Sequence, residues 1–289
     1  MGNSALVMEG GAMRGMFTCG VLDVFMENGI TFDAGAGISA GAVFGCNFKS
    51  KQIGRPIRYN KKYAKDKRYC STWSWIKTGD MYGVDFCYRE LPYELDPFDW
   101  DTYKKNPLKF YIGTTNVETG DPEYYLCTGD EERDLKWMQA SASMPIVSKI
   151  VEVDGKKMLD GGMIDAVPFK YMESLGYNNN VIILTQAKGY RKKQTRILPL
   201  AKINLRKYPK MVEVLKNRHI MYNKQMDELD EIEAAGKSIV IRPPESLGIS
   251  RTESNPDELE RVYQIGRKVA EDKLEEIKEF LNKETHKNA

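Results

Sequence analysis

The serine best placed for nucleophilic chemistry lies in the pentapeptide Gly37-Ile38-Ser39-Ala40-Gly41. A G-x-S-x-G pattern forms a sharp turn from a strand into a helix, and that turn exposes the serine hydroxyl. Small residues precede the pattern at 34–38, and an apolar stretch rich in glycine and alanine follows at 40–48. We therefore predict that Ser39 is a nucleophile at a strand-to-helix turn, with Gly37 and Gly41 keeping side chains out of that turn.

A nucleophilic serine needs a base, and this chain has almost no histidine to supply one. Its two histidines are His219 and His286, the second close to the C-terminus. Asp160 is the alternative, because it ends a predicted hairpin strand and is followed by Gly161 and Gly162, which leave its carboxylate open to close approach. Asp-Gly pairs also occur in plain turns. To act as a base near pH 7, Asp160 would need burial to raise its pKa above the usual value of about 4.

A second glycine-rich turn, Glu9-Gly10-Gly11-Ala12-Met13-Arg14-Gly15, follows an apolar run near the N-terminus and allows three interpretations. A dinucleotide fingerprint would need glycine in place of Ala12 and an acid after the next segment, for which Asp33 is available, but the serine turn follows at once. An oxyanion hole would need free backbone N–H groups, which Gly10, Gly11 and Ala12 could donate. Arg14 and Gly15 would then support the loop, or Arg14 would attract an anionic head group. The third interpretation is a tight turn without a chemical role.

These turns need a sheet to position them. Strand, glycine turn and helix follow one another twice at the start of the chain, which predicts parallel strands with crossover helices. The first two helices are expected at 15–28 and 40–48. A last helix begins at Pro256, with Asn255 as its cap and Glu258 completing a capping box, and its apolar spacing continues to Leu281. The predicted strands are 5–8, 34–38, 109–117, 123–127, 151–153, 156–159, 181–185 and 238–241.

The composition is that of an ordinary soluble protein, with 42% hydrophobic and 29% charged residues among 289. Basic residues cluster, nine in residues 49–68 and eleven in residues 188–218, and each segment holds a single acid. Such blocks are usually solvated faces, but apolar residues interleave with the second segment. It therefore either contacts an anionic membrane surface or packs its apolar side on the domain. The aromatic-rich residues 70–107 form either a lid or loops anchored in the core.

Five cysteines, an odd number without CxxC spacing, fit neither a disulfide framework nor a zinc site and are typical of a reduced, cytoplasmic protein. No secretory signal and no run of about 18 apolar residues is visible, so contact with a membrane would be peripheral, at its inner face. We expect no metal and no other cofactor, because the histidines are isolated and the acids lack ligand spacing. The basic segments come without a nucleic-acid-binding motif, so no nucleic acid is expected as a partner.

Four blocks of this chain resemble, in order and spacing, those of the patatin-like phospholipases. They are the turn at 9–15, the serine turn at 37–41, the stretch Ala140-Ser141-Ala142-Ser143-Met144-Pro145, and Asp160-Gly161-Gly162. The resemblance covers roughly residues 4–190. Two positions depart from the family's pattern, because Glu9 replaces an aspartate and Ala12 replaces a glycine. An alanine N–H can still donate, provided that the backbone there does not need a positive φ angle.

The resemblance implies a three-layer α/β/α fold with a mainly parallel central sheet. It places an acyl-hydrolase domain at residues 1–190. Outside the resemblance, the sequence pattern predicts a basic, mainly helical C-terminal extension at 191–289, packed on that domain, with a strand near 238–242.

The resemblance also implies a serine acyl hydrolase of the phospholipase A, lysophospholipase or esterase type. Such an enzyme cleaves lipid or other acyl esters through a Ser39–Asp160 dyad and an acyl-enzyme, with the turn at 9–15 as the oxyanion hole. Two alternatives remain. One is a non-catalytic lipid- or acyl-binding protein on the same fold, and the other is a nucleotide-binding α/β protein that uses the first glycine turn.

Overall fold

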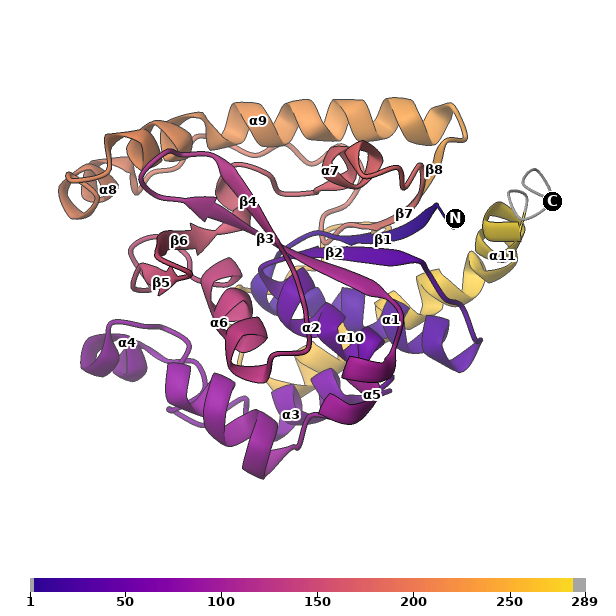
Figure 1. The fold of residues 1–289 in the computed structure, drawn as a ribbon, viewed down its shortest axis with the longest axis horizontal. Helices are drawn as coiled ribbons and strands as arrows, with labels where there is room; N and C mark the ends of the chain where they lie inside the picture. The colour runs from indigo at the N-terminus through magenta and orange to yellow at the C-terminus, as the bar shows by residue number, and fades with distance from the viewer. Residues whose placement is uncertain (1–2, 283–289) are drawn as a thin grey trace.

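The computed structural model describes residues 3–282 and shows a mixed sheet between two layers of helices (Figure 1). In these residues the sheet has eight strands, in the order β5-β6-β3-β2-β1-β7-β8, with β4 paired to β3 outside this path. The five consecutive strands β3, β2, β1, β7 and β8 run parallel to one another, which confirms the predicted fold class. β4 and β6 pair with β3 in the antiparallel sense. The strands are β1 (Ser4–Met8), β2 (Ala34–Ile38), β3 (Lys109–Asn116), β4 (Pro122–Leu126), β5 (Val151–Val153), β6 (Lys156–Asp160), β7 (Asn179–Ile183) and β8 (Ser238–Ile241).

Alternate side chains of β1 serve the two faces of the sheet, as the two-residue period of a strand requires. Leu6 and Met8 belong to the larger core, whereas Ala5 and Val7 belong to a second core on the other face. Figure 1 shows α7 and α9 above the sheet and α1, α2, α6 and α10 below it. These helices are α1 (Gly15–Glu27), α2 (Ala40–Lys49), α6 (Glu131–Ser141), α7 (Phe169–Ser174), α9 (Pro209–Ala234) and α10 (Pro256–Asp272).

One edge of β3 is shared by two strands, and this sharing brings the ends of β2 and β6 together. β2 pairs with β3 as far as Gly113, opposite Ile38. β6 pairs with β3 in the antiparallel sense from Thr114, opposite Asp160. β4 overlaps both of these pairings, and therefore occupies the other edge of β3. The carboxyl ends of β2 and β6 thus meet where Gly113 is joined to Thr114.

Residues 49–107 are mostly helical rather than irregular. Phe86, Leu91 and Trp100 are buried in the larger core, so apolar packing builds this region into the domain. The first basic segment is largely used within the fold, as in the ion pair of Lys61 with Glu260 at 2.7 Å. The helices of this region are α3 (Arg55–Tyr63), α4 (Thr72–Thr78), the π-helix η2 (Phe86–Leu95) and α5 (Trp100–Lys105).

The chain after residue 190 contributes to the sheet and to both helical layers. β8 extends the sheet beyond β7, α9 covers one face, and α10 covers the other. The remaining helices are α8 (Leu198–Asn204) and α11 (Leu274–Asn282). The division of the chain at residue 190 stays a prediction. None of the helices within residues 3–282 combines the length and the apolar content needed to cross a membrane.

The prediction of one continuous last helix was wrong, because the chain breaks at Lys273 between α10 and α11. Asn255 does cap α10, and its side chain accepts a hydrogen bond from the Asp257 N–H at 3.1 Å. The capping box does not form, because the Glu258 carboxylate accepts instead from Arg261 at 2.8 Å.

Glycines allow α1 and α10 to cross closely, and the crossing gives a test of how the C-terminal segment is held. A Cβ added at Gly266 would lie 2.0 Å from the Phe17 carbonyl oxygen. We expect Gly266→Ala to lower the free energy of unfolding by about 3 kcal/mol, because both backbones must move apart. Urea unfolding measures this change.

The matched control is Gly35→Ala, whose added Cβ would lie at an ordinary 3.4 Å from the Phe110 ring. We expect this variant to unfold within about 1 kcal/mol of the parent. Equal losses in the two variants would contradict the close crossing.

Candidate active site

Ser39 lies at the turn between β2 and α2, in the strained conformation typical of a nucleophile turn. Its φ and ψ angles are 54° and −119°, a region that costs an L-residue on the order of 1–3 kcal/mol. Gly37 and Gly41 let the turn close, because a Cβ on either would lie 2.4 Å from a backbone oxygen. The strain is held in place by a hydrogen bond of 2.8 Å from the Ser39 N–H to the Ser141 hydroxyl.

The small-residue block at 140–145 forms hydrogen bonds on both sides of the site, near the serine turn and at the end of β6. The Ser141 hydroxyl donates to the Gly113 carbonyl oxygen at 2.7 Å, and so connects the serine turn to β3. The Ser143 carbonyl accepts from the Asp160 N–H at 2.8 Å. Sequence reasoning identified this block but did not predict that its serines position the candidate nucleophile and base.

Asp160 ends β6, is 2% exposed, and lines the same small cavity as Ser39, with a volume of about 60 Å³. We call this the central cavity. The Oδ1 atom of Asp160 accepts from the Gly162 N–H at 2.8 Å. Within the part of the chain that the structure describes, Oδ2 has no hydrogen bond of ordinary geometry to Ser39 or to any other group. Gly161 permits this placement, because a Cβ there would lie 2.4 Å from the Gly113 oxygen.

The environment of Asp160 favours its protonated form relative to an aspartate in water. Burial raises the pKa of Asp160 above its usual range, and this is the largest effect. The nearby Ser39 hydroxyl, the Arg218 guanidinium and the Gly162 N–H lower the pKa and so oppose that rise. The direction is the one that a carboxylate base working near neutral pH requires.

The first glycine turn packs directly on Ser39. A Cβ on Gly10 would lie 2.8 Å from the Ser39 Cβ, and one on Gly11 would lie 2.6 Å from the Thr185 hydroxyl. No hydrogen bond is recorded within residues 3–282 for the backbone N–H groups of Gly10, Gly11 or Ala12, all of which line the central cavity. Ala12 has a φ of 50°, so this turn does adopt the positive φ angle that glycine would accept without strain.

Glu9 is a buried anchor of the turn. Its carboxylate accepts from the Thr185 N–H at 2.7 Å and from the Tyr222 hydroxyl at 2.8 Å, and so joins β1 to the chain after β7 and to α9. Gly15 begins α1 against the Phe44 ring, which a Cβ would approach to 2.8 Å. Arg14 precedes it and lines the central cavity.

Two residues that sequence reasoning considered lie away from the central cavity. Asp33 precedes β2 at the amino edge of the sheet, where its carboxylate accepts from the Ser4 hydroxyl at 2.6 Å. It cannot serve as the ribose ligand of a dinucleotide at the glycine turn, which lies at the carboxyl edge. His219 lines a different cavity, and His286 lies outside the described residues.

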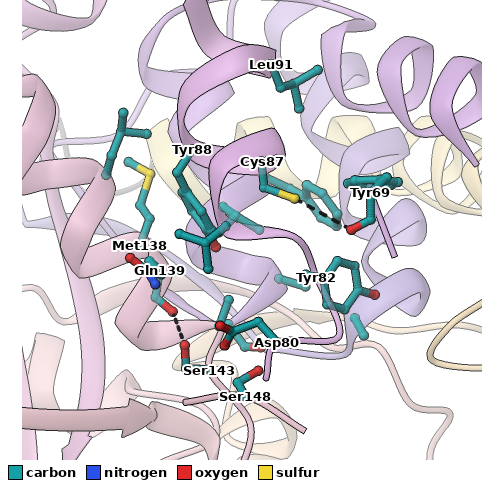
Figure 2. Close-up of a pocket in the computed structure, with 18 of the residues that line it drawn as sticks. Tyr69, Asp80, Tyr82, Cys87, Tyr88, Leu91, Met138, Gln139, Ser143 and Ser148 are labelled. Carbon is teal, nitrogen blue, oxygen red and sulfur yellow. Dashed lines mark hydrogen bonds between the residues drawn. The ribbon is translucent and has the colours of Figure 1, made fainter. Parts of the chain in front are cut away.

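A larger cavity of about 290 Å³ extends from Ser39 between α2, η2 and α6. Its volume is close to the lower end of the usual range for small-molecule pockets, about 300–1,000 Å³. Figure 2 shows Cys87, Tyr88 and Leu91 of η2 on one side of it and Met138 and Gln139 of α6 on another. Most of its lining is apolar or aromatic, and we call it the apolar cavity. Sequence reasoning missed it, because its walls come from segments far apart in the chain.

The chain after residue 190 adds cations that sequence reasoning also missed. Lys192, Arg218 and Arg251 line the central cavity beside Arg14. Arg218 is oriented by a hydrogen bond of 2.7 Å from its Nε to the Gly162 carbonyl oxygen. The basic pattern at 188–218 contained two of these residues, but nothing in that pattern separated them from the exposed lysines around them.

Two segments of this chain match known protein families. Residues 6–172 match the family described as Patatin-like phospholipase, and residues 208–282 match a domain of unknown function, DUF6363. An uncharacterized protein of Escherichia coli, YjjU, is 30% identical over 189 residues, which cover 64% of this chain and 52% of that protein. The lysophospholipase nte1 of Aspergillus terreus is 28% identical over 184 residues, which cover 59% of this chain and 11% of that protein.

Two solved structures share a broad likeness at low sequence identity. VipD from Legionella pneumophila has a TM-score of 0.45 and 11% identity, over 98% of this chain and 67% of that one. The type III effector ExoU has a TM-score of 0.41 and 10% identity, over 96% of this chain and 53% of that one.

The Patatin-like phospholipase match covers more than half of the chain and includes both glycine turns, the small-residue block and Asp160. The chain spans about half the length of the bacterial relative and about a tenth of the fungal one. This chain belongs to the patatin-like phospholipase family.

Proposed function

We propose that this protein is a serine hydrolase that cleaves the acyl esters of lipids. The observation that carries the proposal is the meeting of Ser39 and Asp160 in one cavity that continues into the apolar cavity. In the first step Asp160 accepts the proton of the Ser39 hydroxyl while the oxygen attacks the ester carbonyl carbon. The alcohol leaves with a proton returned by Asp160, and an acyl-enzyme remains on Ser39.

The glycine turn stabilises the negative charge that develops in this step. The free N–H groups of Gly10, Gly11 and Ala12 donate to the carbonyl oxygen as it becomes an oxyanion. Asp160 then takes a proton from water, which attacks the acyl-enzyme, and Asp160 returns that proton to the Ser39 oxygen as the fatty acid leaves. The apolar cavity holds the acyl chain through both steps, because its lining offers contacts with methylene groups and few competing hydrogen bonds.

Hydrolysis of p-nitrophenyl esters of increasing acyl length tests this proposal. We expect the unmodified protein to be active and Ser39→Ala and Asp160→Asn each to lose at least about a hundredfold in kcat/KM, because each removes one proton-transfer partner. Circular dichroism and urea unfolding check that both variants fold. Activity that survives Asp160→Asn in a folded protein would refute Asp160 as the base.

The pH dependence of the same reaction follows from the pKa of Asp160. The base must be ionised, and burial raises its pKa, so kcat/KM should increase with pH through a value above that of a solvated aspartate, about 3.9. Arg218 lowers the pKa of Asp160, so Arg218→Gln should move this acidic limb to higher pH. The control Lys237→Gln, at the amino edge of the sheet before β8, should leave the limb in place. A shift to lower pH in Arg218→Gln would contradict the assignment.

Exposed apolar residues beside the cavities favour contact with a lipid surface. On α4, Ile76 is 80% exposed next to Trp73 and Trp75, and on α8 Ile203 is 69% exposed. Both helices lie at the left end of the molecule in Figure 1, toward which the carboxyl ends of β1 and β2 point. Ile146 connects them, because its carbonyl accepts from the Trp75 indole at 3.2 Å while its side chain packs in the core beside α8.

Basic residues accompany these side chains, so the bilayer that fits this surface is an anionic one. Lys77 on α4 and Lys202 on α8 lie within the two helices, and Arg196 precedes α8. Insertion of isoleucine and tryptophan side chains into the interface would supply apolar burial, and the cations would supply attraction to acidic head groups.

Co-sedimentation with phosphatidylglycerol vesicles tests this surface. We expect Ile76→Glu and Ile203→Glu each to weaken vesicle binding about tenfold, because a carboxylate replaces a side chain that inserts into the bilayer interface and is repelled by anionic lipid. The matched control is Ile53→Glu, since Ile53 is 47% exposed but follows α2 at the amino edge of the sheet. Equal loss in all three variants, or none, would contradict the assignment.

A further inference from the structure

A third cavity, of about 360 Å³, adjoins the central cavity on the side of the C-terminal segment. Met144 and Arg251 line this cavity as well as the central and the apolar one, so all three meet at these side chains. Lys192 and Arg218 are shared with the central cavity. We call the third cavity the basic cavity, because lysines and arginines line it and no aspartate or glutamate of the described residues does. Its lining otherwise comes mainly from residues 190–197, from α9 and from the loop at 144–145.

In the described residues the cations at this junction form no direct ion pair, although Asp160 and Glu9 attract them at longer range. Within residues 3–282, no ion pair is recorded for Lys192, Arg218, Arg251 or Arg14. The Lys192 ammonium lies over the Tyr222 ring, 4.1 Å from its centroid, and the lysine backbone is fixed on both sides by the Asn223 side chain.

The two acidic residues nearby, Glu9 and Asp160, make hydrogen bonds to other groups. Glu9 is bonded to Thr185 and Tyr222, and Asp160 accepts from the Gly162 N–H and faces Ser39. The Nε atom of Arg14 is buried without a hydrogen-bond partner in the described part of the chain.

Burial and mutual repulsion make this cluster costly without an anion. Burial, the largest cause, and repulsion by the neighbouring Arg218 together lower the pKa of Lys192 to about 7. Burial likewise lowers the pKa of Arg218. A negatively charged ligand would stabilise the charged forms of these buried cations, because it replaces the water that burial removed and supplies the counter-ion that they lack.

We propose that Lys192, Arg218 and Arg251 form a binding site for the phosphate of an anionic phospholipid head group beside Ser39. This inference rests on the proposed function, in which the acyl chain occupies the apolar cavity. The phosphate oxygens accept from the free guanidinium N–H groups and the ammonium, while the ester carbonyl reaches the glycine turn. The acyl chain and the head group of the lipid then lie in different cavities, on either side of the junction. Arg218 and Arg251 lie in the segment that matches the domain of unknown function.

The same lining discriminates against zwitterionic head groups. A quaternary ammonium is held in proteins by carboxylates or by several aromatic faces. Among residues 3–282 the basic cavity offers Tyr190 and no carboxylate, and the choline group would meet Lys192, Lys193 and Arg218. Like charges across a binding site oppose the wrong ligand, so the structure favours lipids whose head group carries a net negative charge.

Calorimetric titration of the Ser39→Ala protein tests the inference without depending on catalysis. Three probes are compared: dihexanoylphosphatidylglycerol, dihexanoylphosphatidylcholine and inorganic phosphate. We expect dihexanoylphosphatidylglycerol to bind at least about tenfold more tightly than dihexanoylphosphatidylcholine. Inorganic phosphate should bind more weakly than either lipid, because it lacks acyl chains. Equal affinity for the two lipids would overturn the inference. If inorganic phosphate bound as tightly as phosphatidylglycerol, the site would be assigned to a free anion instead.

Variants in the same Ser39→Ala background identify the residues. Arg251→Gln and Lys192→Gln should each weaken binding of phosphatidylglycerol about tenfold and weaken binding of phosphatidylcholine less, because each removes a partner of the phosphate but also relieves repulsion of the choline group. Arg251→Lys should retain most of the affinity, because it keeps the charge. The control Lys237→Gln changes the net charge equally at the opposite edge of the sheet and should have no effect. Loss in the control as large as in Arg251→Gln would show a general charge effect and refute the site.

The outcomes for hydrolysis and for binding separate the two proposals. Hydrolysis that requires Ser39, together with equal binding of the two lipids, would refute the head-group site alone. Selective binding of the anionic lipid by a protein that hydrolyses no ester would refute the hydrolase alone.

Discussion

The edge of β3 that is shared by β2 and β6 is the constraint on which the site depends. β2 leaves this edge at Gly113, and β6 takes it from Thr114 in the opposite direction. Two strand ends therefore face each other, one followed by Ser39 and the other formed by Asp160. Because strand pairing is a rigid ladder of backbone hydrogen bonds, the separation of the two side chains is set by the sheet and not by loop conformation.

The site combines strained backbone conformations with a buried carboxyl group, and contacts with the surrounding structure keep both in place. Ser39 and Ala12 adopt positive φ angles, which the tight packing between their turns and the hydrogen bond to Ser141 maintain. Asp160 is buried with one oxygen lacking a hydrogen-bond partner in the described residues, and burial raises its pKa. Interactions outside the reacting groups, such as those of Glu9 with Thr185 and Tyr222, offset these costs and keep the geometry from relaxing.

The three cavities differ in the chemistry of their walls. The side built by α2, η2 and α6 is mostly apolar, whereas the side built by the chain after residue 190 is cationic. This division gives the C-terminal segment a place in the site itself, because Lys192, Arg218 and Arg251 lie around the central cavity. The same segment supplies β8 to the sheet and Tyr222 to the glycine turn, so folding of the site requires residues well beyond the Patatin-like phospholipase match.

The local features of this protein could be predicted from its amino-acid sequence alone. Small residues around Ser39 and the glycine turn after β1 predicted two strand-to-helix turns, and the Asp154-Gly155 pair predicted the hairpin that ends at Asp160. Such features depend on backbone conformation within a few residues, which composition and spacing reveal. The break of the last helix at Lys273 was not predicted, because apolar spacing continues through it.

Which of these features come into contact depends on the folded arrangement of the whole chain. The pairing of Thr114 with Asp160, the hydrogen bond from Ser39 to Ser141, and the approach of Arg251 to the central cavity each join residues far apart in the chain. The same holds for the protonation of Asp160, since its pKa depends on burial by segments that do not neighbour it in sequence. Periodicity and motif spacing describe local geometry, whereas cavities and electrostatic fields are sums over the folded chain.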